Sequence, residues 1–233
     1  MLYSIDMQVI KSTDWADGVA DLSARIIDAL TSNKKVLWLL SGGSNIDASV
    51  KIMEQIPDEL SVGLIVGLID ERFGLPGHQD SNMQQLLTSG FRAKHAKLIP
   101  ILQPGLDLER TVEEYEKAVI QALRQADVSI AQLGIGEDCH IAGILPNSAA
   151  ALETENFIKS YKSDPYTRIT LTFPGLEKID ICYAFAFGEN KKQALNEIIN
   201  ESHSIVEKPG TILRDLDEVY IYSDQAGEEG NDE

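Results

Sequence analysis

Short apolar runs alternate along this chain with amphipathic stretches of helical period, and no other feature constrains the fold as strongly. Residues 36–40 form an uninterrupted apolar run, as in a strand buried on both faces of a parallel sheet. In the preceding segment, apolar residues recur at steps of three and four, which places them on one face of a helix. The same patterns predict strands over 64–69, 128–133, 168–172, 181–187 and 219–222, and helices over about 47–56, 108–123 and 188–199.

Strands that alternate with helices predict an α/β fold with a mostly parallel sheet and helices on both of its faces. The chain has 233 residues and neither an internal repeat nor a low-complexity linker. We therefore expect one domain over residues 1–226, followed by an acidic tail over 227–233. The segment 146–165 has no clear period, and we interpret it as an irregular insertion over the functional site.

The balance of charges excludes two classes of partner. The chain carries 20 Lys and Arg residues against 37 Asp and Glu residues, which gives a net charge of −17. Proteins that bind nucleic acids or anionic membranes usually carry a net positive charge, so we expect this chain to bind neither. An anionic small molecule must be held by a few local cations against this field. No apolar run approaches ~18 residues, so no membrane-spanning helix is expected.

The chain is expected to act in the cytoplasm, as a monomer or a small homo-oligomer. Its N-terminal segment lacks the basic region and apolar core of a secretory signal. The two cysteines, Cys139 and Cys182, form neither a CxxC pair nor a metal-binding spacing. We expect both to be free thiols.

Four predicted strands end in polar or glycine-rich clusters. These are Ser-Gly-Gly-Ser after position 40, Asp-Glu-Arg after 69, a glycine-rich run ending in His140, and Gly-Glu-Asn-Lys after 187. Each cluster alone has an ordinary structural explanation, such as a tight turn or a surface ion pair. Ligands of open parallel sheets bind beyond the carboxyl ends of the strands, so the fold would bring all four clusters to one edge.

These clusters hold the parts of an anion site. The backbone N–H groups of Gly42, Gly43 and Ser44, at the start of a helix, suit a phosphate. Three cations near strand ends are candidates for binding the same anion, and together with the glycine turn we call them the anion clamp: Arg72, Arg168 and Lys191. Lys191 and Lys192 are neighbours about 100° apart on a helix, so only one of them can face the site.

Acid–base chemistry has three candidates. His140 is of the residue type that most often serves as a general base near neutral pH. Asp138 is placed to orient His140 or to contact a sugar hydroxyl, and Glu71 is a second acid–base candidate. The chain has no metal-ligand spacing, no P-loop and no complete dinucleotide fingerprint, because Cys139 replaces its last glycine. We therefore expect no metal and no cofactor.

The motifs together resemble the 6-phosphogluconolactonases, within the larger family that also holds glucosamine-6-phosphate isomerases/deaminases. The matching segments are LWLLSGGS, IDERF followed by HQDSN, LGIGEDCHIAGILPNSAAL, RITLTFPGLEKID, FGENKKQAL and the ending KPGTILRDLDEVYIYSDQA. They occur in family order over about residues 36–226. The resemblance implies a Rossmann-like three-layer sandwich, with Asp70 and Asn82 among the substrate-binding residues.

Within that family, the resemblance favours the lactonase branch. Deaminases typically carry a glutamate just after the motif histidine, whereas this chain has residues 143–146, Gly-Ile-Leu-Pro, there. The implied reaction is hydrolysis of 6-phosphogluconolactone in the oxidative pentose phosphate pathway, with His140 activating a water. The chain departs from the lactonase pattern at Cys139, Ile141 and Gly143, where glycine, threonine and serine are usual. A Cβ at position 139 alters the loop if that residue has φ > 0.

Three other functions remain open. The first alternative is an amino-sugar-phosphate isomerase/deaminase, for which Asp70 would be the enolising base. The second is a sugar-phosphate sensor that binds its ligand through the same cations but does not catalyse a reaction, as the departures around His140 suggest. The third alternative is a structural partner of another pathway enzyme, for or against which the sequence gives no argument.

Overall fold

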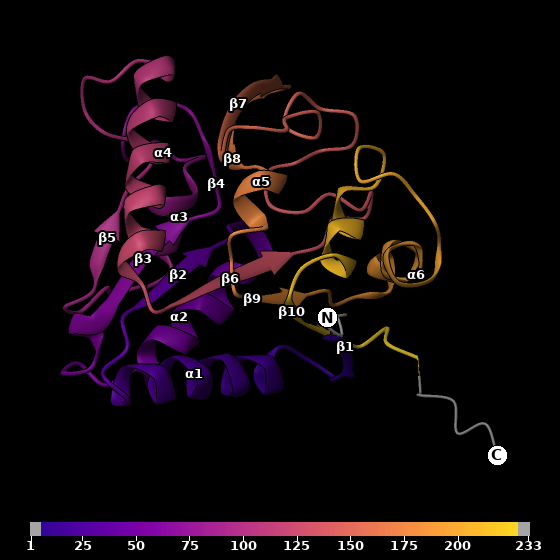
Figure 1. Cartoon of the computed structure of the whole chain (residues 1–233), viewed down its shortest axis with the longest axis horizontal. Coiled ribbons are helices and arrows are strands. Elements are labelled where there is room, and N and C mark those ends of the chain that lie inside the picture. Colours follow the sequence, from indigo (N-terminus) through magenta and orange to yellow (C-terminus); the bar gives the residue numbers. More distant parts are fainter. Residues whose placement is uncertain (1–5, 228–233) are drawn as a thin grey trace.

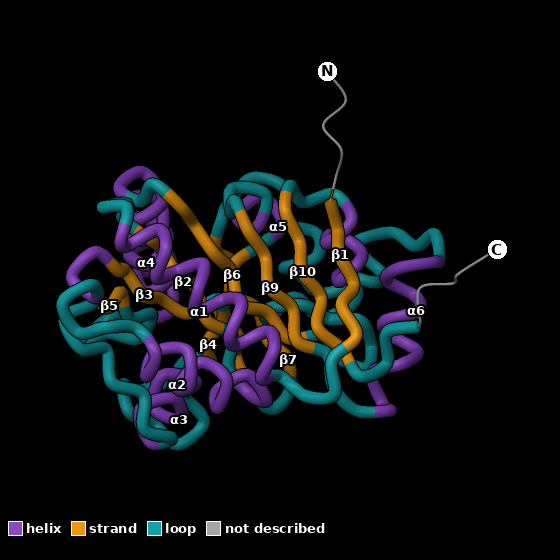
Figure 2. Tube along the Cα trace, turned by 90° about the horizontal axis from the view of Figure 1, so that it is seen from below, coloured by secondary structure: helices purple, strands orange, loops and turns teal. Residues whose placement is uncertain are grey.

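The main sheet of the computed structural model, which describes residues 6–227, contains seven parallel strands. The tail expected over 227–233 lies, apart from its first residue, outside the described residues. The sheet order is β1-β10-β9-β6-β2-β3-β5, and Figure 2 shows these strands side by side. The strands are β1 (Asp6–Lys11), β10 (Glu218–Ser223), β9 (Ile181–Phe185), β6 (Val128–Gly134), β2 (Val36–Leu40), β3 (Leu64–Leu68) and β5 (Lys97–Ile99).

Helices cover both faces of this sheet, as predicted. In Figure 1, α1 (Ala16–Thr31) and α2 (Ile46–Gln55) lie below the sheet, whereas α4 (Leu108–Gln125) and α5 (Phe173–Leu176) lie above it. The described residues also form α3 (Asn82–Thr88), α6 (Lys192–Asn200) and four short 3-10 helices: η1 (Gly43–Asn45), η2 (Ser61–Gly63), η3 (Glu189–Lys191) and η4 (Pro209–Arg214). Within residues 6–227, no helix has the length and apolar character that crossing a membrane requires.

The centre of the sheet is the core of the molecule. Every residue of β2, β3 and β9 is buried, because helices or the small sheet cover both faces of these strands. Burial of such apolar side chains stabilises a fold by about 25 cal/mol per Å². Both cysteines are free and buried.

A second, antiparallel sheet lies above the main one, with the order β4-β8-β7. It is formed by β4 (Asp70–Arg72), β8 (Tyr166–Leu171) and β7 (Ile158–Ser163). The last of these corrects the prediction of an irregular segment over 146–165. β7 consists mostly of polar, half-buried residues, so its sequence contains no apolar run that would predict a strand.

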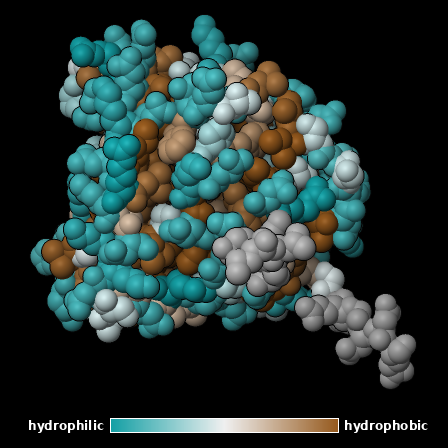
Figure 3. Space-filling view, viewed as in Figure 1, coloured by the Kyte–Doolittle hydropathy of each residue, from teal (hydrophilic) through white to brown (hydrophobic). Residues whose placement is uncertain are grey.

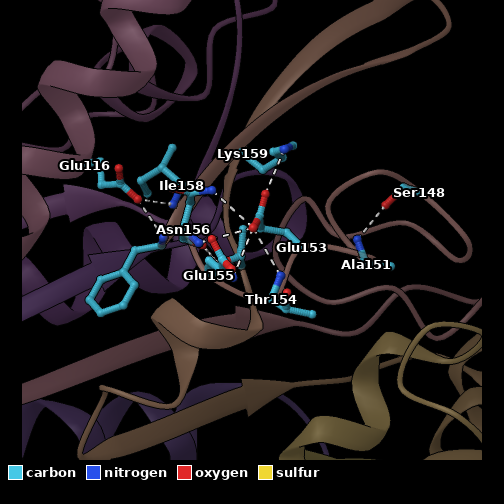
Figure 4. Close-up of polar contacts among 11 residues, drawn as sticks. Glu116, Ser148, Ala151, Glu153, Thr154, Glu155, Asn156, Ile158 and Lys159 are labelled. Carbon is cyan, nitrogen blue, oxygen red and sulfur yellow. Dashed lines mark hydrogen bonds and ion pairs between the residues drawn. The ribbon is translucent and has the colours of Figure 1, made fainter.

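Two carboxylates fix the loop that leads into β7 (Figure 4). Glu116 of α4 accepts the backbone N–H of Ile158 at 3.2 Å and that of Phe157 at 2.6 Å. Glu153 pairs with Lys159 at 2.7 Å and accepts three backbone N–H groups of its own loop. The loop is therefore ordered by hydrogen bonds rather than by regular structure.

The strand order reverses between β2 and β6. From β2 the chain proceeds through β3 to β5 on one side, and from β6 it proceeds through β9 and β10 on the other. Such a switch point leaves a crevice beyond the carboxyl ends of the two strands.

Candidate active site

A polar pocket of about 270 Å³ occupies this crevice. The segments after β2 and β6 form its floor, β4 and β8 of the small sheet form one wall, and η3 contributes Lys191. The lining residues are Ser41, Gly42, Gly43, Ser44, Asn45, Asp70, Arg72, Asn82, Gly134, Ile135, Gly136, His140, Ala142, Arg168 and Lys191. All eight predicted substrate-binding residues and His140 are among them.

The turn after β2, residues 41–45, lines the pocket. Gly43 has φ +63°, a conformation that favours glycine, and both Gly43 and Ser44 are exposed. A Cβ on Gly42 would lie 2.2 Å from Asn82 Oδ1, so only glycine lets the turn approach α3 this closely. The turn leads through η1 into α2, whose first backbone N–H groups favour an anion.

Two arginines meet across the small sheet. Arg72 of β4 is the direct register partner of Arg168 of β8. Like charges directly opposite in a sheet destabilise it unless an anion lies between them. Arg72 donates to the Asp80 carbonyl oxygen at 2.8 Å, and its guanidinium lies 5.3 Å from the centre of the Tyr166 ring. These contacts fix Arg72 and leave charge available to the pocket.

Asp70 is the buried carboxyl group of the wall. It accepts a hydrogen bond from Asn82 Nδ2 at 3.2 Å, and the same amide donates to its backbone carbonyl at 2.9 Å. Burial raises the pKa of Asp70, and the cations of Arg72 and Arg168 oppose that rise. One carboxyl group near two arginines leaves a net positive charge for a ligand to neutralise.

Several buried polar atoms of the pocket have no hydrogen-bond partner within the described part of the chain. Five such side-chain atoms occur there, and four belong to residues that line the pocket: Ser41 Oγ, Arg72 Nε, Asn82 Oδ1 and Arg168 Nε. Buried polar groups in native proteins are normally paired. Their concentration in one crevice is typical of a site that a polar ligand completes.

His140 and Asp138 form one hydrogen-bonded unit in the turn after β6. His140 Nδ1 lies 2.6 Å from Asp138 Oδ1, and the same oxygen accepts the backbone N–H of His140 at 3.1 Å. The hydrogen bond from His140 lowers the pKa of Asp138 to about 2, so the carboxylate is charged at neutral pH. A Cβ on Gly136 would lie 2.0 Å from Nδ1, which means that the imidazole rests on this glycine. Nδ1 is thus committed to Asp138, and Nε2 is the nitrogen left for chemistry.

Glu71 lies behind the pocket and is not among its lining residues. Its side chain is fully buried and accepts the backbone N–H groups of Arg72, Asn82 and Met83. Ser81 Oγ also donates to it, at 2.8 Å. The structure therefore does not bring this predicted acid–base candidate together with His140, and Glu71 instead ties β4 to the start of α3.

None of the three departures from the lactonase pattern is among the residues that line the pocket. Cys139 and Ile141 are fully buried, and a Cβ on Gly143 would lie 2.8 Å from the Thr170 side chain. Cys139 has φ +66°, so the residue at this position does adopt the left-handed conformation.

Sequence reasoning did not single out six of the lining residues: Ser41, Asn45, Gly134, Ile135, Gly136 and Ala142. Most of them lie inside or beside the motifs used above. Their closeness in sequence to Gly42 and His140 could have indicated that they line the pocket.

Comparisons with known proteins place the chain in a family. A family model described as glucosamine-6-phosphate isomerases/6-phosphogluconolactonase matches residues 12–221. A 6-phosphogluconolactonase of Xylella fastidiosa is 28% identical over 199 residues, covering 80% of this chain and 82% of the relative. One of Pseudomonas aeruginosa is 28% identical over 187 residues, covering 76% and 77%.

Solved structures agree on the fold. A 6-phosphogluconolactonase from Thermotoga maritima superposes with a TM-score of 0.78 at 21% identity, covering 93% of this chain and 98% of that one. One from Trypanosoma brucei gives 0.75 at 16% identity, covering 95% and 98%. Since the family model matches residues 12–221 of 233, the chain belongs to the family of glucosamine-6-phosphate isomerases and 6-phosphogluconolactonases.

Proposed function

We propose that this chain is a 6-phosphogluconolactonase, which hydrolyses 6-phospho-D-glucono-1,5-lactone to 6-phosphogluconate without a cofactor. The observation that carries the proposal is that His140, which is hydrogen-bonded to Asp138, lines the same pocket as Arg72 and Arg168. A base beside an anion clamp fits hydrolysis of a phosphorylated ester. The names of the curated relatives support the same activity.

The 6-phosphate binds at the glycine turn and the cations. The backbone N–H groups of Gly43 and Ser44 donate to it, and Arg72, Arg168 and Lys191 supply the positive charge. Charge-assisted hydrogen bonds of this kind are roughly twice as strong as neutral ones. They offset the repulsion between the substrate and a chain of net charge −17.

His140 acts as the general base. Its Nε2 takes a proton from a water while the water oxygen attacks the lactone carbonyl carbon, and Asp138 stabilises the imidazolium that forms. Backbone N–H groups or a cation of the pocket hold the oxyanion, a contribution of about 3 kcal/mol per donor. The bond between the carbonyl carbon and the ring oxygen then breaks, and His140 returns the proton to that oxygen.

Two substrates tested in parallel decide between the family's branches. The purified chain is given freshly generated 6-phosphogluconolactone, read above spontaneous opening, and separately glucosamine 6-phosphate. We expect rapid opening of the lactone and no ammonia from the amino sugar. Activity on the amino sugar alone would assign the isomerase/deaminase reaction, with Asp70 as the residue to mutate. Binding of 6-phosphogluconate without turnover of either substrate would assign a sensor.

A further inference from the structure

The turn that carries His140 is a three-residue hairpin loop. Ile135 and Ile141 pair as an antiparallel bridge, and the Gly136 N–H donates to the His140 carbonyl oxygen at 2.9 Å. The Cys139 N–H donates to the Gly136 carbonyl oxygen at 3.0 Å. Such loops end in a residue of left-handed conformation, for which glycine is preferred. Here that residue is Cys139, at φ +66°.

The side chain of Cys139 is held by a charged pair from another part of the fold. Its Sγ lies 3.2 Å from Glu197 Oε2 of α6, and the same oxygen pairs with Lys208 Nζ. Gln193 of α6 donates to the other carboxylate oxygen at 2.9 Å. The hydrogen bond from Lys208, and to a smaller extent that from Gln193, lowers the pKa of Glu197 to about 2. Burial and the Glu197 carboxylate raise the pKa of the Cys139 thiol to about 12, so the S–H remains a donor.

A backbone hydrogen bond joins the same elements. The Gly210 N–H, at the start of η4, donates to the Cys139 carbonyl oxygen at 2.7 Å. A Cβ on Gly210 would lie 3.1 Å from that oxygen and 2.5 Å from Ile198 of α6. The residue just before His140 is therefore clamped by α6 through its side chain and by η4 through its backbone.

We propose that Glu197 is a positioning residue for His140, and that it acts through the thiol of Cys139. Lys191 immediately precedes α6 and lines the pocket, whereas Glu197 lies within α6. The Glu197–Cys139 contact thereby fixes the distance between the cation of Lys191 and the imidazole of His140. The proposal rests on the function proposed above, in which Lys191 binds phosphate and His140 is the base.

The test is a set of variants assayed for kcat and KM on the lactone. Glu197→Ala and Cys139→Ala each lower kcat on the order of tenfold, since a small misplacement of a catalytic group is costly. The double variant loses no more than the worse single variant, because both act through one contact. Cys139→Ser, which keeps a donor at this position, retains most of the activity. Glu218→Ala is the matched control: it breaks the 2.7 Å ion pair with Arg25 at the amino end of β10 and leaves kcat unchanged.

A second readout does not depend on turnover. The NMR titration of the His140 imidazole shifts in Glu197→Ala and Cys139→Ala relative to the native chain and to Glu218→Ala. An unchanged kcat with an unchanged titration would overturn the proposal, as would losses that multiply in the double variant. A native chain without lactonase activity would overturn the proposed function, whereas the titration would still test the positioning of the imidazole.

Discussion

His140 and Asp138 illustrate how two residues become one functional group. They are two positions apart, and the tight turn between them brings the carboxylate to 2.6 Å from Nδ1. The bond fixes the ring orientation and leaves Nε2 as the nitrogen that is available for chemistry. A change at Asp138 should therefore act on the chemical step rather than on binding of the substrate.

Asp138→Asn removes the charge while keeping the size of the side chain. We expect kcat to fall on the order of a hundredfold, because an amide neither stabilises the imidazolium nor enforces the tautomer. The dissociation constant of 6-phosphogluconate, measured by calorimetry, should stay within about threefold. Unaltered kcat in this variant would exclude a role for Asp138 in orienting the base.

Glu71 provides a test of structure rather than of chemistry. Its carboxylate faces four donors: three backbone N–H groups and the Ser81 hydroxyl. In Glu71→Gln the amide N–H₂ replaces one accepting oxygen, so buried donors lose their partner at a cost of about 1–3 kcal/mol. Urea unfolding measures the loss, with Glu113→Gln on the exposed face of α4 as the control. Equal stability of the two variants would contradict this account of Glu71.

The sequence could predict which residues line the pocket where the motif and the fold impose the same position. Gly42, Gly43 and Ser44 follow a buried strand, so the sheet topology carries them to the pocket. Glu71 was a candidate on residue type alone. Nothing in the Asp-Glu-Arg motif indicates that the side chain of Glu71 is buried against the start of α3.

Among the elements, the central parallel strands were predictable and the peripheral ones were not. β2, β3 and β9 consist almost wholly of apolar residues, and β6 mostly of them, because both of their faces are covered. β1 and β5 are edge strands, and β5 has only three residues. A strand over 168–172, most of β8, was predicted, but its antiparallel pairing was missed because β4 is three polar residues and pairs with β8 through a long-range contact.

The contact between α4 and the start of β7 gives a prediction on this scale (Figure 4). Glu116→Ala leaves the backbone N–H groups of Phe157 and Ile158 without their acceptor. We expect a loss of about 1–3 kcal/mol in the free energy of unfolding and a kcat within twofold of native. Urea unfolding measures the change in stability, and the lactonase assay measures kcat. A loss of kcat without a loss of stability would show that β7 contributes to the chemistry.

For the whole molecule, charge is the dominant property. Hydrophilic side chains cover most of the face in Figure 3, and the net charge is −17. The positive residues of the pocket are therefore a local exception in a field that repels an anion. This explains why the site concentrates cations on β4, β8 and η3 rather than relying on long-range attraction.

Stability should fall steeply in acid. Asp138, Glu153 and Glu197 have pKa values lowered to about 2, by His140, Lys159 and Lys208 respectively. Unfolded carboxyls titrate near pH 4, so these groups stabilise the fold above about pH 4 and lose that contribution as the pH falls to about 2. Urea midpoints measured at pH 4, 3 and 2 should therefore drop step by step. A midpoint that is constant down to pH 2 would contradict these ion pairs.

The most direct test of the proposed function is the turnover of His140→Ala on 6-phosphogluconolactone. General-base catalysis predicts a fall in kcat of about 10²–10⁴, with the fold and the affinity for 6-phosphogluconate retained. Affinity serves as the control because the phosphate contacts that we propose involve Gly43, Ser44 and the cations, and not His140. Turnover close to that of the native chain would remove His140 from the role of base and contradict the mechanism.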